Sequence, residues 1–269
     1  MNALVVSSIL LLPTLVNGCA QLVKKDPRDF YVGIGNWSDK RERVYCTGAI
    51  LATSKTYTVL TVKQCFDALH LPVHRIKLMR WNPSNGALIK AAVIEIMIID
   101  NYFAIKPKPG FIQRYENIFL NRDYDPDGCT VVHPQLPIGD SVNLKTSIVK
   151  PVTTQECKKY VNYDYWEEVR AERIKCFVPR YSGRLCSLNI GYLLACNQNK
   201  ELGGVGFLKD AQACYVVVPV WNTKYLNTSS LPGVTVVSSL STIRLSKIVV
   251  IFITLSNLLT YLYLIIPEY

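Results

Sequence analysis

The sequence is poor in histidine and contains no Cys-x-x-Cys pair. Only three of its 269 residues are histidine, and its nine cysteines do not have the spacing of structural zinc sites. His70 and His74 are spaced like two ligands on one helix, but Pro72 between them breaks such a helix. His133 directly precedes Pro134, in a predicted loop. We therefore expect no metal site and no cofactor, and we assign the histidines to the structure or the surface.

Acidic residues are also few, because 20 Asp and Glu stand against 30 Lys and Arg, which gives a formal net charge of +10. Basic clusters lie at residues 24–25, 40–43 and 145–150. Such clusters attract sulfated glycans or other anionic surfaces. A solvated basic face has the same composition, so both interpretations stay open.

The first 20 residues contain neither Lys nor Arg and carry an apolar run from Leu4 to Val16. The small residues Gly18-Cys19-Ala20 follow it, which is typical of a signal-peptide cleavage site. Cleavage after Ala20 removes Cys19 and leaves eight cysteines in an apolar-rich chain that can form a buried core. Eight thiols allow 105 pairings, which the sequence alone cannot resolve. An exported chain is not expected to bind nucleic acid.

The sequence lacks the pattern of long amphipathic helices. It has instead short runs rich in Val, Ile and Tyr, separated by Pro, Gly and Asn. The runs are Tyr57–Val62, Leu88–Ile98, Thr130–Val132, Gly204–Leu208 and Tyr215–Trp221. Many short strands with turn signals between them favour an all-β sandwich or barrel.

One loop resembles a known catalytic segment. Cys186-Ser-Leu-Asn-Ile-Gly-Tyr-Leu-Leu-Ala-Cys196 is similar to the nucleophile loop of chymotrypsin/trypsin-like serine proteases, roughly Cys-x-Gly-Asp-Ser-Gly-Gly-Pro-x-x-Cys. Counted from the first cysteine, the family's serine falls on Ile190, its aspartate on Asn189 and its oxyanion-binding glycine on Leu188. Among these positions Gly191 alone still matches.

Two further segments carry the same resemblance. Residues 44–51 and 60–66 resemble the family's Cys-Gly-Gly-x-Leu-Ile and Thr-Ala-Ala-His-Cys block, which puts the general-base position at Gln64. Residues 100–106 resemble Asn-Asp-Ile-x-Leu-Ile-Lys, which puts the third triad position at Asn101. Asp100 is adjacent, but neighbouring strand residues face opposite sides, so it could substitute only after a register slip.

The resemblance implies an enzyme fold without its chemistry. Ile190, Gln64 and Asn101 provide no nucleophile, no base and no carboxylate to orient the base. The oxyanion position is lost at Leu188. Arg184 takes the base of the primary pocket, where it would repel Lys or Arg. It is either a surface arginine that fills a collapsed pocket or the base of a pocket for an acidic group. Within the matched segment 29–34, Tyr31-Val-Gly-Ile34 follows Phe30 and not a Lys or Arg, so the family's activating cleavage is not expected.

The resemblance also implies an all-β architecture of two six-stranded antiparallel β-barrels. The trypsin-like domain would span residues 21–228, with barrel 1 at about 31–121, barrel 2 at about 128–228 and an intermediate helix and loop at 157–176. It further implies one set of disulfides, which uses all eight remaining cysteines: Cys46–Cys65, Cys129–Cys196, Cys157–Cys176 and Cys186–Cys214.

The composition changes after residue 228. A Ser-, Thr- and Val-rich linker (229–247) leads to a 19-residue stretch without charge, residues 248–266. This length suits a transmembrane helix, or the removable tail of a lipid-anchor signal. Either form would hold the domain at the membrane, on the outer face. The sequons at Asn36 and Asn227 fit glycosylation in the secretory pathway.

We thus expect a catalytically inactive serine protease homologue on the cell exterior, or a secreted one if the tail is processed. Its partner would be an extracellular protein such as a protease, a protease substrate or a receptor. Two alternatives remain: a hydrolase with a rebuilt site, for which Ser187 and Lys63 are the nearby candidates, and a basic glycan-binding surface protein.

Overall fold

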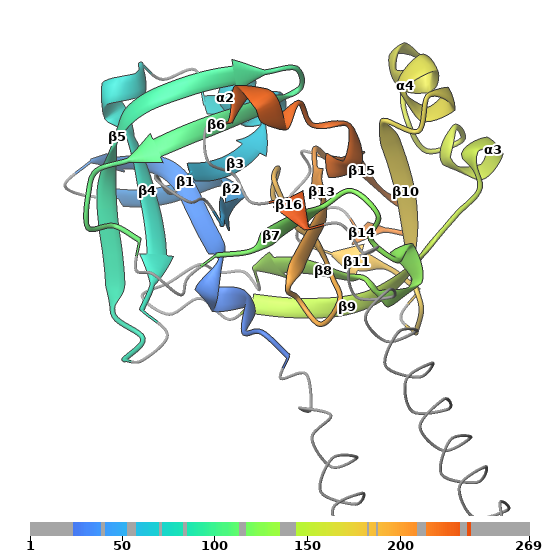
Figure 1. Cartoon of the computed structure of the whole chain (residues 1–269), viewed down its shortest axis with the longest axis horizontal. Coiled ribbons are helices and arrows are strands. Elements are labelled where there is room, and N and C mark those ends of the chain that lie inside the picture. Colours follow the sequence, from blue (N-terminus) through green and yellow to red (C-terminus); the bar gives the residue numbers. More distant parts are fainter. Residues whose placement is uncertain are drawn as a thin grey trace, which may run out of the picture.

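The computed structural model in Figure 1 describes residues 24–38, 41–52, 58–69, 72–82, 85–112, 117–134, 144–181, 183–186, 188–208, 214–231 and 236–237. The predicted signal peptide, the apolar segment 248–266 and most of the linker lie outside these residues. No helix within the described ranges is long and apolar enough to cross a membrane.

Barrel 1 is a closed ring of antiparallel strands in the order β1-β2-β3-β6-β5-β4. Its strands are β1 (Tyr31–Ser38), β2 (Arg41–Leu51), β3 (Thr58–Val62), β4 (Ile76–Trp81), β5 (Leu88–Ile99) and β6 (Tyr102–Pro107). Pairing of β1 with β4, for example Ile34 with Leu78, closes the ring. Both side chains are fully buried. Because the ring is closed, each of the six strands pairs with a neighbouring strand on both sides.

Barrel 2 is closed by an additional strand pairing. Its strands are β8 (Thr130–Pro134), β9 (Leu144–Pro151), β10 (Ile174–Pro179), β12 (Leu193–Cys196), β13 (Glu201–Gly206) and β15 (Val218–Asn222). They follow the order β12-β8-β9-β10-β15-β13, and β12 pairs with β13 to complete the ring. The described fold is therefore all-β with two six-stranded antiparallel barrels, as the resemblance implied.

Short elements connect and decorate the barrels. The helices are η1 (Pro27–Asp29), α2 (Lys63–Leu69), η2 (Val73–Arg75), η3 (Pro126–Gly128), α3 (Thr154–Cys157), η4 (Tyr163–Tyr165), α4 (Trp166–Arg170), η5 (Thr223–Tyr225) and η6 (Thr228–Ser230). A small sheet pairs β11 (Leu185–Cys186) with β14 (Cys214–Tyr215). Figure 1 shows α3 and α4 projecting beside β10 at the edge of barrel 2.

The segment between the barrels forms a strand of its own. β7 (Phe119–Asn121) was placed at the end of barrel 1 by the prediction, but it pairs in parallel with β13 of barrel 2. On its other side it pairs with β16 (Val236–Val237). The chain thus begins to join barrel 2 before the predicted boundary.

Most predicted strands are confirmed, with two differences. The run Tyr215–Trp221 is divided between β14 and β15, because residues 216–217 bend between two different sheets. His133 lies in β8 and is 4% exposed, so its predicted loop position is wrong. Pro134 is the last residue of that strand, where a missing N–H is tolerated.

The four disulfides pair as the resemblance implied: Cys46–Cys65, Cys129–Cys196, Cys157–Cys176 and Cys186–Cys214. The first lies within barrel 1, and the other three lie within barrel 2. Disulfides are typical of proteins that fold in an oxidising compartment, such as the secretory pathway.

Candidate functional site

The position matched to the nucleophile lies directly against barrel 1. The backbone N–H of Thr47 donates to the Ile190 carbonyl at 2.8 Å, and the Thr47 hydroxyl donates to the same oxygen at 3.4 Å. Cys46, which also bridges to Ile190, is disulfide-bonded to Cys65, the residue after Gln64. The nucleophile and base positions are therefore linked through one strand residue and one disulfide.

The third matched position, Asn101, is connected to the segment of Gln64 through Lys63, the residue before Gln64. The backbone N–H of Lys63 donates to the Asn101 carbonyl at 2.9 Å. Lys63 is exposed, and Ser187 lies outside the described residues. These backbone contacts and the disulfide connect the segments that carry Gln64, Asn101 and Ile190, whose side chains are two amides and an alkyl group. Their match to the triad positions stays a prediction.

The loop that carries Ile190 is buried. Leu188 is fully buried in the core of barrel 2, Ile190 is 3% exposed and Asn189 is 7% exposed. Leu188 is not among the described non-glycine residues with positive φ, so its backbone avoids the conformation that favours glycine. The Asn189 Nδ2 is buried without a partner among the described residues.

Gly191, the one residue that matches the family loop, is required by close packing. Its φ is +88°, and a Cβ built on it would lie 1.9 Å from the Thr47 carbonyl oxygen. Any side chain would therefore push the loop away from barrel 1. The absence of a side chain at Gly191 therefore allows Ile190 to accept the hydrogen bond from Thr47.

A tyrosine from barrel 2 contacts the base position. The Gln64 Nε2 donates to the Tyr165 hydroxyl at 3.5 Å, while Gln64 Oε1 is buried without a partner among the described residues. The Tyr165 ring packs against Phe207 and Trp221, with ring centroids 5.3 Å and 6.1 Å away. Sequence patterns did not reveal this aromatic cluster. The density of aromatics between Cys157 and Cys176 was the available signal.

Asn101 lines a pocket of about 480 Å³ at the junction of the barrels. Its lining residues are Asp100, Asn101, Tyr102, Glu168, Arg173, Trp221, Asn222 and Tyr225. Burial raises the pKa of the Tyr102 phenol well above its ordinary value, with smaller contributions from Tyr124 and Asp100. This phenol is therefore a neutral hydrogen-bond donor at physiological pH.

Arg184, the predicted base of the primary pocket, is exposed. It lines neither the pocket at Asn101 nor a second one of about 310 Å³ beside α3. Its neighbour Ser182 lies outside the described residues. Of its two predicted roles, the exposure favours a surface arginine, and a pocket around it stays a prediction.

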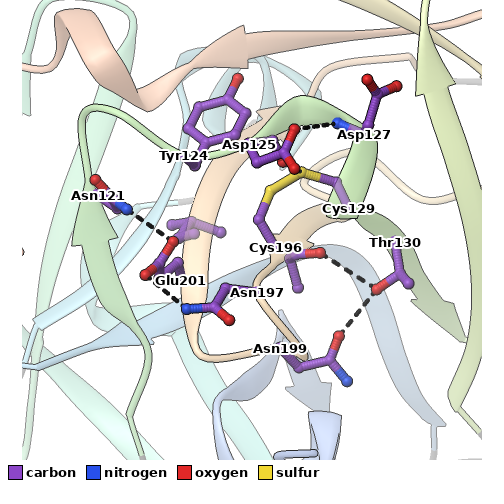
Figure 2. Close-up of a disulfide and its surroundings, with 12 residues drawn as sticks. Asn121, Tyr124, Asp125, Asp127, Cys129, Thr130, Cys196, Asn197, Asn199 and Glu201 are labelled. Atoms are coloured by element: carbon purple, nitrogen blue, oxygen red, sulfur yellow. Dashed lines mark hydrogen bonds between the residues drawn. A yellow bond between two sulfur atoms is a disulfide. The ribbon is translucent and has the colours of Figure 1, made fainter. Parts of the chain in front are cut away.

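The chain before β1 runs along barrel 2. Lys25 N–H donates to the Gln198 carbonyl, and Asn199 Nδ2 donates to the Lys25 carbonyl, each at 3.0 Å. Figure 2 shows the same turn next to the Cys129–Cys196 disulfide, with the Thr130 hydroxyl donating to Asn199 Oδ1 at 2.9 Å. Tyr31, within the segment matched to the family's activated amino terminus, is instead the buried first residue of β1.

The other predicted sites are partly described. Asn36 is half-buried in β1, and Asn227 is exposed, where its Oδ1 accepts from the backbone N–H of Ser229 at 3.2 Å. Lys145 and Lys150 of one basic cluster are exposed on β9. Among the described residues there is no group of three His, Cys, Asp or Glu side chains that could hold a metal ion.

Comparison with solved structures settles the architecture. The chain matches the VesB protease of Vibrio cholerae with a TM-score of 0.53 at 15% identity, over 73% of this chain and 61% of VesB. It matches the scabies mite inactivated protease paralogue S-D1 with a TM-score of 0.50 at 19% identity, over 73% and 88% of the two chains. This chain has the trypsin-like fold.

A further trypsin-like structure, kallikrein-related peptidase 10, matches with a TM-score of 0.53 at 13% identity, over 79% of this chain and 95% of the peptidase. At these identities, the structural matches establish the fold alone. No protein-family model and no curated protein sequence matches the chain.

Proposed function

We propose that this chain is a catalytically inactive serine protease homologue, displayed on the cell exterior, that works as a protein-binding or regulatory module. The observation that carries the proposal is the residue set gathered at the barrel junction: Ile190, Gln64 and Asn101. Acyl transfer needs a nucleophile, a base that takes its proton and a carboxylate that orients the base. An alkyl group and two neutral amides supply none of these.

The surroundings of these residues support the proposal. Leu188 and Ile190 are buried, and Tyr165 packs beside Gln64, so a protein ring lies next to the base position. In an active site of this fold, that position needs an imidazole free to reach the nucleophile. In the proposed inactive form, the side chains at these positions contribute to packing between the barrels and transfer no proton.

The test of inactivity is labelling with a fluorophosphonate, which reacts with activated serines. The purified full chain is incubated with the probe, with trypsin as the positive control and heat-denatured chain as the background. We expect labelling no stronger than background. Labelling that disappears in Ser187→Ala, but not in the remote variant Ser147→Ala on β9, would show a rebuilt hydrolase site instead.

Display on the exterior is supported by the four disulfides and by the exposed sequon at Asn227. Surface biotinylation of expressing cells tests it. A phosphatidylinositol-specific phospholipase then distinguishes the two anchors, since it releases a lipid-anchored chain and leaves a transmembrane one. Absence of the chain from both the surface and the medium would contradict the proposal.

The binding role is supported by the retained scaffold. The scabies mite paralogue, described as inactivated, has the same fold, so the two barrels are also found in a protein so described. We expect the partner to be an extracellular protein. Crosslinking on intact cells followed by affinity capture would identify it, and recovery of heparan sulfate chains alone would favour the glycan-binding alternative.

A further inference from the structure

The pocket at Asn101 is formed by three separate segments. Asp100 and Asn101 form the turn between β5 and β6, and Tyr102 is the first residue of β6. Glu168 and Arg173 come from α4 and the turn after it, and the remaining lining residues come from β15 and η5. Its volume of about 480 Å³ lies within the roughly 300–1,000 Å³ of typical ligand sites. The pocket is therefore large enough for a side chain and the backbone next to it.

The charged groups of this pocket leave one carboxylate for a ligand. Glu168 forms an ion pair with Arg173 through the arginine Nε and Nη2. Asp100 is exposed at the turn and forms no ion pair with a described residue at salt-bridge distance. A cation entering the pocket would gain a charge-assisted hydrogen bond from Asp100.

Aromatic rings form part of the walls. Trp221, Tyr225 and Tyr102 all line the pocket, and ring faces attract cations. Lys224 places its Nζ 5.9 Å from the centroid of the Tyr225 ring, so this ring already contacts an ammonium group in the folded chain. A basic side chain fits both the rings and the carboxylate.

Two buried donors in the walls lack acceptors. Tyr102 is 4% exposed and Trp221 is 3% exposed, and neither the Tyr102 hydroxyl nor the Trp221 Nε1 has a partner among the described residues. A buried donor without an acceptor destabilises the fold unless a ligand or water supplies one. The side-chain amide of Asn222 is engaged elsewhere, since its Oδ1 accepts from Tyr124 and its Nδ2 donates to the Glu172 carbonyl. Backbone carbonyls of a bound peptide are the acceptors that such donors require.

We propose that this pocket binds a peptide segment that contains a lysine or arginine, with the cation at Asp100 and peptide carbonyls facing Tyr102 and Trp221. The site does not use Gln64 or Ile190. It therefore stands independently of the proposed inactivity, and a fluorophosphonate result does not change it.

The test uses short probes and the full chain. Acetyl-Gly-Lys-Gly-amide is titrated by calorimetry and by the NMR signal of the Trp221 indole N–H, which Trp221→Phe identifies. The norleucine analogue has the same length without the charge, and n-butylamine has the cation without the peptide. We expect the lysine peptide to bind at least about fivefold more tightly than either, since each missing contact removes about 1 kcal/mol.

The matched variants are Asp100→Asn, which removes the pocket carboxylate, and Asp123→Asn, which removes an exposed carboxylate elsewhere. Asp100→Asn should weaken the lysine peptide about fivefold, and Asp123→Asn should leave it unchanged. Unchanged thermal unfolding confirms that each variant folds, and Asp100→Gly, which suits the φ of +53° at this residue, replaces Asp100→Asn if that variant does not fold. Equal affinity for the lysine and norleucine peptides, no binding at millimolar concentration, or full affinity in the folded variant at Asp100 would overturn the proposal.

Discussion

Gln64 of barrel 1 donates its side-chain amide to the hydroxyl of Tyr165, which belongs to a disulfide-closed loop of barrel 2, at 3.5 Å. This contact joins the two barrels at the place matched to a catalytic base. At the long end of hydrogen-bond distances it is a weak bond, so most of the stabilisation comes from the packing of the Tyr165 ring on Phe207 and Trp221.

Truncation of this ring should destabilise the fold. Tyr165→Ala removes a half-buried aromatic side chain, and we expect a loss of about 2 kcal/mol in the free energy of unfolding, below the roughly 3–5 kcal/mol of a fully buried ring. Tyr165→Phe removes only the hydroxyl and should cost less than about 1 kcal/mol. Urea unfolding measures both. Tyr163, which is 74% exposed, is the control, and equal losses for Tyr163→Ala and Tyr165→Ala would contradict this role of the ring.

Gly191→Ala should be among the most damaging single changes. The new Cβ would lie 1.9 Å from the Thr47 carbonyl oxygen, and the φ of +88° adds strain. Gly110 has a similar φ of +85°, but a Cβ added there meets nothing within 4 Å, so Gly110→Ala has the strain alone. We expect about 1 kcal/mol for Gly110→Ala and more than about 3 kcal/mol for Gly191→Ala. Thermal and urea unfolding check the difference, and similar values would show that the contact with Thr47 is unimportant.

The disulfides should differ in their contribution to stability. Cys129–Cys196 spans a sequence separation of 67, and Cys157–Cys176 spans 19. Because a longer closed loop restricts the unfolded chain more, paired Cys→Ala replacement should cost about 4 kcal/mol for the first and about 3 kcal/mol for the second. Equilibrium unfolding without reductant measures this. The reverse order would point to strain or to residual structure in the unfolded chain.

His133 should make the fold less stable in mild acid. Burial lowers the pKa of its imidazole, the hydrogen bond with the Pro134 carbonyl partly opposes this effect, and Lys145 adds a smaller lowering. The unfolded chain, with an ordinary pKa near 6.5, therefore binds more protons below that pH than the folded chain does. The free energy of unfolding should fall as the pH drops below about 6.5.

His133→Gln should remove this part of the pH dependence, measured by urea unfolding between about pH 7.5 and 5. His74 is exposed in η2, so His74→Gln should leave the slope unchanged. A slope that survives in His133→Gln would assign the effect to other groups.

The architecture could be predicted because the cysteines mark it. Cys186 and Cys196 bound the loop that resembles the family's nucleophile loop, and Cys65 follows Gln64, so the resemblance implied both the disulfide pairing and the three matched positions. The structure has that pairing. The runs rich in Val, Ile and Tyr also located β3, β5 and β8, because strand-forming composition and the turn residues around it are local properties.

The rest depends on contacts between distant segments. Nothing near Tyr165 indicates that its ring reaches Gln64, which is 101 residues away. The parallel pairing of β7 with β13 and the division of Tyr215–Trp221 between two sheets also arise from tertiary packing, which local patterns do not record. The pocket at Asn101 is likewise assembled from three segments and has no motif.

Turnover decides whether the barrel junction is inactive. The purified chain is incubated for a day with a broad peptide library at neutral pH, and the products are identified by mass spectrometry with trypsin in parallel. We predict no cleavage above the buffer control at any bond. Sequence-specific cleavage by the chain that is lost when one residue beside Ile190 is replaced would contradict the proposed inactivity.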